Sequence, residues 1–145
     1  VETASAAAEK AVCHLRARYD NGDRSMKEYL TLCLPLRREM MTTARPAAGG
    51  PCAVAGMSYD GGEDCKVCVT ESLLLLMRRG FSAASVQFTD CERGICVRVR
   101  GTDGSASVAL SDEDEIALAL LNALAESVTM QEAEGCISFV FGSQE

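Results

Sequence analysis

The chain has 145 residues, of which 48% are hydrophobic and 24% charged, a composition typical of one folded domain with its own core. Its formal net charge of -7 argues against nucleic acid or an anionic membrane surface as the main partner, since both favour a basic surface. The longest uninterrupted apolar run, residues 73–77, is far shorter than a membrane span requires.

Cysteine is unusually frequent for a chain of this length. The eight positions are Cys13, Cys33, Cys52, Cys65, Cys68, Cys91, Cys96 and Cys136. An even number favours a disulfide framework outside the cytoplasm, and metal or thiol chemistry inside it. The cysteine content therefore favours an extracytoplasmic, disulfide-stabilised protein, although the sequence does not decide the compartment.

Residues 1–45 are predicted to be a helical N-terminal part. Residues 5–19 consist mostly of strong helix formers, and Ser25 with Glu28 forms a capping-box pattern that begins a second helix. Pro35 is expected to kink or restart that helix, and residues 36–44 resume helical composition. His14, the only histidine, directly follows Cys13, but consecutive residues of a helix do not face each other, so the two are not expected to form a catalytic pair.

Residues 46–64 are predicted to be a connection, because they contain Pro46, Pro51 and five glycines. A short extended piece is expected at residues 54–59. Residues 69–79 are predicted to form a helix that ends at Gly80 in the left-handed conformation. The α+β core is expected to span residues 65–145, and the whole chain to form one compact domain.

The clearest pattern covers residues 85–110 and predicts a three-stranded antiparallel meander. A four-residue loop at 92–95 would place Cys91 opposite Cys96, and Asp103 with Gly104 would form a two-residue turn into the third strand. Both turns assign the same apolar residues to the inner face: Val86, Phe88, Val97, Val99, Ala106, Val108 and Leu110. The solvent face then holds Ser85, Gln87, Thr89, Cys91, Cys96, Arg98, Arg100, Ser105 and Ser107.

The rest of the chain is predicted to be a helix followed by a strand. Ser111 is a good N-cap, and the acidic residues 112–115 lie where the helix dipole favours negative charge, so capping explains them better than metal binding. Residues 136–141 are predicted to be a final strand that can add to the meander. The fold class is therefore α+β: N-terminal helices, then a helix, a three-stranded antiparallel meander, a helix and a final strand, in two layers.

Four cysteines carry the candidate chemistry. Cys91 and Cys96 are the disulfide candidate, since neighbouring strands would hold them together on the solvent face. With Cys65 and Cys68 they also match the general layout of a four-cysteine zinc site, which is the alternative interpretation. A third interpretation is a thiol oxidoreductase using Cys65 and Cys68 near a helix N-terminus, but the two acidic residues directly before Cys65 would raise a thiol pKa. No catalytic residue is assigned, and no cofactor other than zinc is implied.

Two groups of residues are candidates for contact with a partner. Leu73 and Leu76 lie in a helix that is apolar around most of its circumference, so the N-terminal helices or another chain would have to cover it. Gln87, Arg98 and Arg100 form a candidate docking surface for an acidic partner, although a solvated strand face explains them equally well.

These patterns predict a non-enzymatic protein–protein interaction or assembly module, whose partner is another protein chain or a second copy of this one. The order of elements in the second half is similar to that of small helix–sheet secretion chaperones and other dimerising modules, a likeness of arrangement without a shared motif.

Overall fold

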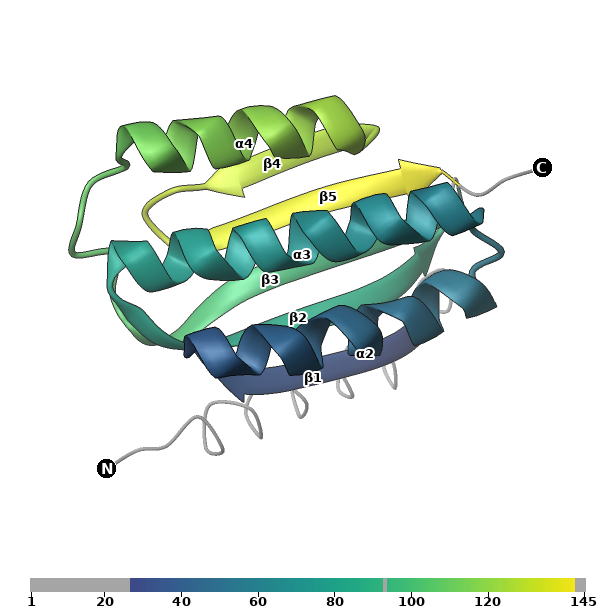
Figure 1. The fold of residues 1–145 in the computed structure, drawn as a ribbon, viewed down its shortest axis with the longest axis horizontal. Coiled ribbons are helices and arrows are strands. Elements are labelled where there is room, and N and C mark those ends of the chain that lie inside the picture. The colour runs from purple at the N-terminus through teal and green to yellow at the C-terminus, as the bar shows by residue number, and fades with distance from the viewer. Residues whose placement is uncertain (1–26, 93, 143–145) are drawn as a thin grey trace.

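The computed structural model describes residues 27–92 and 94–142. Within these residues the chain is an α+β protein with three α-helices, one short 3-10 helix and a five-stranded antiparallel sheet (Figure 1). In chain order the elements are β1 (Glu28–Pro35), η1 (Arg38–Met40), α2 (Met41–Val54), α3 (Tyr59–Arg79), β2 (Phe81–Cys91), β3 (Gly94–Gly104), α4 (Asp112–Leu124), β4 (Ser127–Gln131) and β5 (Cys136–Gly142).

The described helices lie side by side across one face of the sheet, with α2 in front of β1, α3 across the middle and α4 beside β4 (Figure 1). The strands follow the order β1-β2-β3-β5-β4, and every neighbouring pair is antiparallel. The core fills the space between helices and sheet. Its fully buried side chains include Val69, Leu73, Leu76, Val86, Phe88, Val97, Ile137 and Phe139. None of the described helices is long and apolar enough to cross a membrane.

The hairpin of β2 and β3 has the predicted faces but not the predicted register. Val86, Phe88, Val97 and Val99 are buried beneath the helices, as expected. Only two residues separate the strands rather than four, so Phe88 pairs with Val97 and Val86 with Val99. A shift by two residues leaves every side chain on the same face, because strand residues alternate with a period of two.

Residues 105–110 are not a strand, so the predicted third strand of the meander is wrong. β2 begins at Phe81 and pairs with β3 as far as Gly104, which therefore belongs to a ladder and not to a hairpin turn. β5 takes the place beside β3. The segment after Gly104 leads to the helices instead, where the amide of Val108 donates to the carbonyl of Arg79 at 3.0 Å.

Residues 28–35 form strand β1 and not the predicted helix. Leu30, Leu32 and Leu34 alternate along it and extend the apolar inner face beside β2. Pro35, expected to kink a helix, is the last residue of this edge strand, a position where its missing N–H is tolerated. The helix predicted over residues 5–19, with His14, and the Ser25 cap lie outside the described residues.

Helix α2 spans Met41–Val54: its first residues, 41–45, were predicted to be helical, but residues 46–54 were predicted to be part of a connection. Pro46 and Pro51 lie inside it, against their usual effect on helices. The buried residues Ala44, Ala48 and Cys52, spaced one per turn, pack α2 against α3. Tertiary packing of this stripe outweighs the low helix propensity of the segment. The extended piece expected at 54–59 is absent as well, since α2 ends and α3 begins there.

The ends of α3 and α4 follow the sequence signals. α3 ends at Gly80 with φ +114°, as predicted, but begins at Tyr59, where the Ser58 hydroxyl accepts the amide of Gly61 at 3.0 Å. Cys65 and Cys68 are therefore well inside the helix and not at its entry. Ser111 caps α4 in a reciprocal capping box with Asp114, as the acidic first turn indicated.

Candidate functional site

Three cysteines gather where α2 packs against α3. Cys52 lies in the last turn of α2, while Cys65 and Cys68 lie in the first half of α3, and all three are buried. Cys52 and Cys65 lie close enough for a hydrogen bond between their thiols to shift the pKa of both. The sequence pairs Cys65 with Cys68 by their spacing and does not indicate the pair of Cys52 and Cys65. Cys52 falls in the predicted connection, for which no neighbouring element could be predicted.

The surroundings of these thiols determine which of them ionises. Burial raises the pKa of Cys68 to about 12, and nearby carboxylates act in the same direction. The hydrogen bond to Cys52, together with burial, also raises the pKa of Cys65. The same hydrogen bond, helped by the charge of Lys66, lowers the pKa of Cys52 against the effect of burial. Cys52 is thus the thiol most readily ionised, whereas Cys65 and Cys68 by themselves lack the thiolate that an oxidoreductase needs.

Ser72 lies on α3, four residues after Cys68. Its hydroxyl is buried without a hydrogen-bond partner among the described residues. Replacing it by alanine removes an unsatisfied polar group, so we expect Ser72→Ala to leave the free energy of unfolding unchanged or to raise it by about 1 kcal/mol. Urea denaturation followed by circular dichroism measures the change. The control is Thr70→Ala, because the Thr70 hydroxyl donates to the Lys66 carbonyl at 2.9 Å. A loss larger than about 1 kcal/mol for Ser72→Ala would contradict the expectation.

Cys91 and Cys96 lie on the opposite face of the sheet from Cys65 and Cys68. The structure does not bring the four cysteines together, and in residues 27–92 and 94–142 no group of three or more His, Cys, Asp or Glu side chains is placed to hold a metal. Cys91 pairs with Gly94 and Cys96 with Thr89, so the two cysteines are diagonal neighbours and not directly opposite each other. Their disulfide stays a prediction, now with a less direct geometry than expected.

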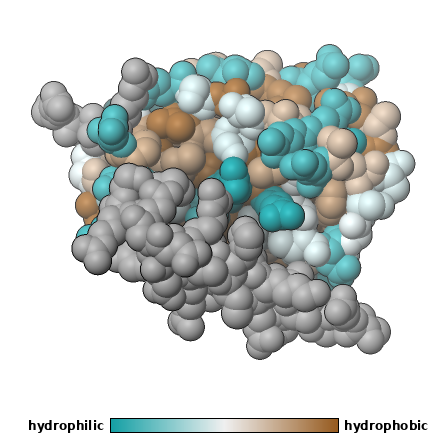
Figure 2. Space-filling view, turned by 180° about the vertical axis from the view of Figure 1, so that it is seen from behind, coloured by the Kyte–Doolittle hydropathy of each residue, from teal (hydrophilic) through white to brown (hydrophobic). Residues whose placement is uncertain are grey.

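The outer face of the sheet carries the predicted arginines. Arg98 and Arg100 are exposed there, with Gln87 opposite Arg98 on β2 and Ser138 on the other side. On the coloured part of this side, hydrophilic and hydrophobic residues are intermixed (Figure 2). Docking of an acidic partner through Gln87, Arg98 and Arg100 stays a prediction.

Leu73 and Leu76 are not available to a partner. Both are fully buried between α3 and the sheet. The sequence suggested that one small sheet would leave part of this helix uncovered, but α2 and α4 flank it on either side (Figure 1). The interaction candidates on α3 are therefore corrected to core residues.

Strand β4 is the last strand of the sheet, and among the residues that the structure describes no other strand pairs with its outer edge. Ser127, Thr129 and Gln131 are exposed, while Val128 and Met130 are half-buried against the core. The strand contains no charged residue and no proline, and its pairing with β5 is regular. The other edge, β1, has an irregular register near Glu28 and ends at Pro35, both of which discourage pairing with another strand. β4 lacks these protective features.

Helix α4 lies beside β4 and is apolar on its outer side as well as its inner side. Ala117 and Leu121 are buried, whereas Ile116 is 71% and Leu120 37% exposed. Glu113, seven residues before Leu120 and therefore on the same stripe of α4, lies 3.8 Å from Arg78 of α3. The exposed apolar residues of α4 thus lie on its outer and α3-facing sides and not beside the edge of β4. We call the exposed residues of β4, at the edge of the sheet beneath α4, the β4–α4 rim: Ser127, Thr129 and Gln131.

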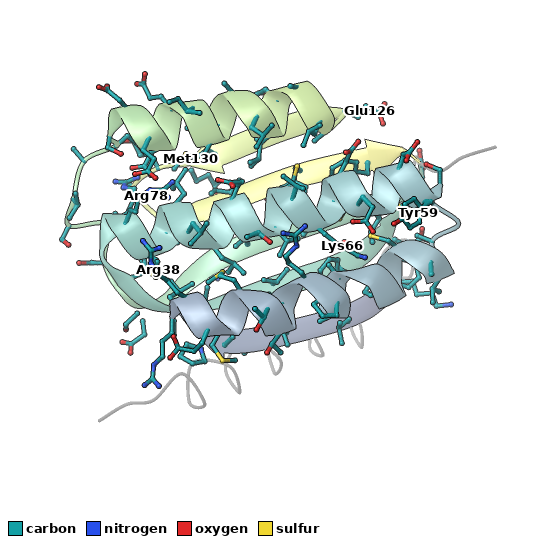
Figure 3. The ribbon with its side chains drawn as sticks, viewed as in Figure 1. Arg38, Tyr59, Lys66, Arg78, Glu126 and Met130 are labelled. Carbon is teal, nitrogen blue, oxygen red and sulfur yellow. The ribbon has the colours of Figure 1, made fainter. Side chains whose placement is uncertain are left out.

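Arg78 ties α4 to α3 and so positions the rim. Its Nε lies 2.6 Å from Oδ1 of the buried Asp114, and one guanidinium nitrogen lies 3.8 Å from Glu113 (Figure 3). Burial alone would raise the pKa of Asp114, but hydrogen bonds from Ser111 and Arg78 outweigh it and lower that pKa. The next residue, Arg79, donates to the carbonyls of Val108 and Glu132 and holds the turn after β4.

The rim was not predicted from the sequence, although a signal was present. Residues 127–131 read Ser-Val-Thr-Met-Gln, an alternation of polar and apolar residues that is typical of a half-buried strand. The turn that follows, residues 132–135, ends at Gly135 with φ +60°. This five-residue alternation, too short to stand out beside the apolar helix before it, is what sequence reasoning missed.

Neither a scan against protein-family models nor a search of the curated proteins found a match for the chain. The function is therefore argued from the geometry of these sites alone.

Proposed function

We propose that the protein is a non-enzymatic interaction module whose β4–α4 rim binds an extended segment of another protein chain. The observation that carries the proposal is the outer edge of β4, which is uncharged, contains no proline and has no strand beside it among the described residues. An extended peptide can add to such an edge through backbone hydrogen bonds, while its alternate side chains contact the neighbouring surface.

Charge around the rim indicates the chemistry of the partner. The consecutive residues Arg78 and Arg79 reach Glu113 and Glu132, so the start of α4 and the end of β4 lie at the same end of the rim. The exposed acidic residues gathered there are Asp112, Glu113, Glu115, Glu132 and Glu134. A strand antiparallel to β4 places its N-terminal end at this position, so complementary charge favours a segment with basic residues before its extended part.

A second copy of the chain fits the rim less well. In the antiparallel register that pairs all five residues of β4 with those of another β4, Thr129 faces its own equivalent. Glu126 of one copy would then lie opposite Glu132 of the other at both ends of the ladder, and like charges directly opposite each other are destabilising. Glu126 and Met130 mark the two ends of the strand in Figure 3. Light scattering is expected to show no dimer formed through β4.

Selection from a random peptide library displayed on phage, with the full chain immobilised, tests the proposal. We expect enriched peptides with basic residues before a stretch of alternating apolar residues. The Thr129→Lys variant should bind them at least about ten-fold more weakly, since an edge lysine blocks strand addition and repels the basic segment. The matched Thr129→Glu variant, with opposite charge at the same exposed position, should not weaken binding. No enrichment, or equal binding to both variants, would overturn the proposal.

A further inference from the structure

The α2–α3 interface brings two cysteines together that are distant from the rim. Cys52 and Cys65 lie close enough for each thiol to shift the pKa of the other, and both side chains are buried. Gly62, one turn before Cys65 on α3, lies directly beneath Cys52: a Cβ at Gly62 would be 3.8 Å from the Cβ of Cys52. The side chain of Cys52 is therefore seated on the face of α3 that carries Cys65.

Small residues allow the two helices to approach closely at this point. On α2 the buried stripe consists of Ala44, Ala48 and Cys52. Gly49 faces Lys66 of α3, where a Cβ would lie 3.2 Å from Cε of the lysine. Disulfide formation requires two Cα atoms within about 7 Å of each other, and helices packed through small residues can meet that requirement without rearrangement.

The two thiols differ in acidity, which gives them different roles. A hydrogen bond with Cys65 and the charge of Lys66 lower the pKa of Cys52. Lys66 Nζ is itself held by Glu63 at 3.1 Å. Cys52 lies in the last turn of α2, beside the exposed residues Ala53 and Val54, so fraying of that helix end gives a small reagent access to it.

We propose that Cys52 and Cys65 are a redox-active pair that is oxidised by a low-molecular-weight disulfide, such as oxidised glutathione, to a disulfide bond joining α2 to α3. The Cys52 thiolate attacks one sulfur of oxidised glutathione, the sulfur–sulfur bond breaks, and one glutathione thiolate leaves. Cys65 then loses its proton to solvent and attacks the sulfur of Cys52, releasing the second glutathione thiolate. The protein dithiol is oxidised by two electrons, and one glutathione disulfide is reduced to two thiols.

Cys68 is the alternative partner for Cys65 and is disfavoured by its surroundings. It lies one turn further along the same helix, and its pKa of about 12 leaves almost no thiolate at neutral pH. The pair proposed here is independent of the function proposed for the rim, because it joins different elements.

Peptide mapping of the full chain tests the proposal. The reduced protein is incubated with mixtures of oxidised and reduced glutathione, quenched with acid, alkylated after unfolding, and digested with trypsin. Because trypsin does not cleave before Pro46, Cys52 and Cys65 fall in one peptide, residues 39–66, whereas Cys68 falls in residues 67–78. We expect the first peptide to lose two hydrogen atoms and to carry no alkyl group, while Cys68 is alkylated.

Two results would overturn the proposal. In one, residues 39–66 become linked to residues 67–78, which would show that Cys68 is the partner. In the other, both cysteines of residues 39–66 remain alkylated at every ratio of oxidised to reduced glutathione. Among variants, Cys68→Ser should oxidise like the natural chain and Cys65→Ser should not form the internal bond, with circular dichroism confirming that both are folded.

Discussion

Arg78→Ala is expected to lower the free energy of unfolding by about 3 kcal/mol, because it leaves the carboxylate of Asp114 buried without its cation. Asp114 is 1% exposed, and the hydrogen bond that its carboxylate keeps is the one from the backbone amide of Ser111 at 3.0 Å. This expected loss is at the lower end of the range for breaking a buried ion pair. The reason is that the Arg78 side chain is 23% exposed, so water can enter the space it leaves. Urea denaturation at pH 7 measures the loss.

A matched variant separates the buried contact from the exposed one. Glu113→Gln removes the other carboxylate near Arg78, whose side chain is 73% exposed at 3.8 Å, and should change the stability by less than about 0.5 kcal/mol. Equal losses for Arg78→Ala and Glu113→Gln would contradict the role assigned to Asp114.

The loss caused by Arg78→Ala should depend on pH. The lowered pKa of Asp114 means that its charged form stabilises the natural protein above the unfolded pKa, about 4, and that this contribution disappears as the pH falls through the folded pKa. In the variant, burial without a cation should raise that pKa, so protonation relieves the penalty. The stability difference between the two proteins is therefore expected to be largest near pH 7 and to shrink towards pH 4. A difference that grows in acid would contradict the argument.

Gly135→Ala is expected to lower the free energy of unfolding by about 2–4 kcal/mol, the sum of a left-handed backbone and a steric clash. Gly135 has φ +60°, and a Cβ there would lie 2.3 Å from Cζ of Phe81. Its carbonyl also accepts the amide of Gly101 at 2.9 Å, so it cannot move away without breaking that bond. Because this turn joins β4 to β5, the change should also weaken peptide binding at the rim.

Two further glycine variants show what a methyl group costs elsewhere. In Gly101→Ala, the new Cβ on β3 would lie 2.3 Å from Cδ1 of the same Phe81 ring. This variant should be destabilising through the clash alone, since Gly101 has no positive φ. Gly50→Ala in α2 meets nothing within 4 Å and should stabilise the protein by about 0.5–1 kcal/mol through helix propensity. Thermal unfolding of the three variants compares their stabilities. A Gly135→Ala protein as stable as the natural chain would contradict the packing described around Phe81.

The faces of the central strands could be predicted from the sequence, but their register could not. Alternation places Phe88 and Val97 on the inner face for either loop length, because a shift by two residues preserves parity. The Asp103-Gly104 signal was misleading for a related reason. Pairing of Phe81 with Gly104, at the far end of a long β2, was not visible in the local pattern.

The first half of the described chain shows where competing signals are decided by packing. Leu30, Leu32 and Leu34 alternate as a strand requires, yet the capping-box pattern at Ser25 and Glu28 favoured a helix. In α2, two prolines predicted a connection, and only the contact of Ala44 and Ala48 with α3 explains why a helix forms. Such contacts between distant segments cannot be read from propensity.

The candidate sites depend on the same long-range placement. The sequence identified the cysteines as the chemical feature of the chain but paired them by spacing along it. The hydrogen bond between Cys52 and Cys65 exists because α2 and α3 fold back on each other. Similarly, the rim arises because β4 follows α4 and takes the outermost place in the sheet, a result of topology rather than of any motif.

Amide hydrogen exchange of the full chain, with and without a peptide selected from the library, tests the docking of an extended segment on β4 most directly. Strand addition predicts that every second amide between Ser127 and Gln131, those directed away from β5, becomes protected when the peptide binds. Protection confined to the outer sheet face around Arg98 and Arg100, with unchanged exchange along β4, would contradict the account and place the partner on the opposite side of the sheet.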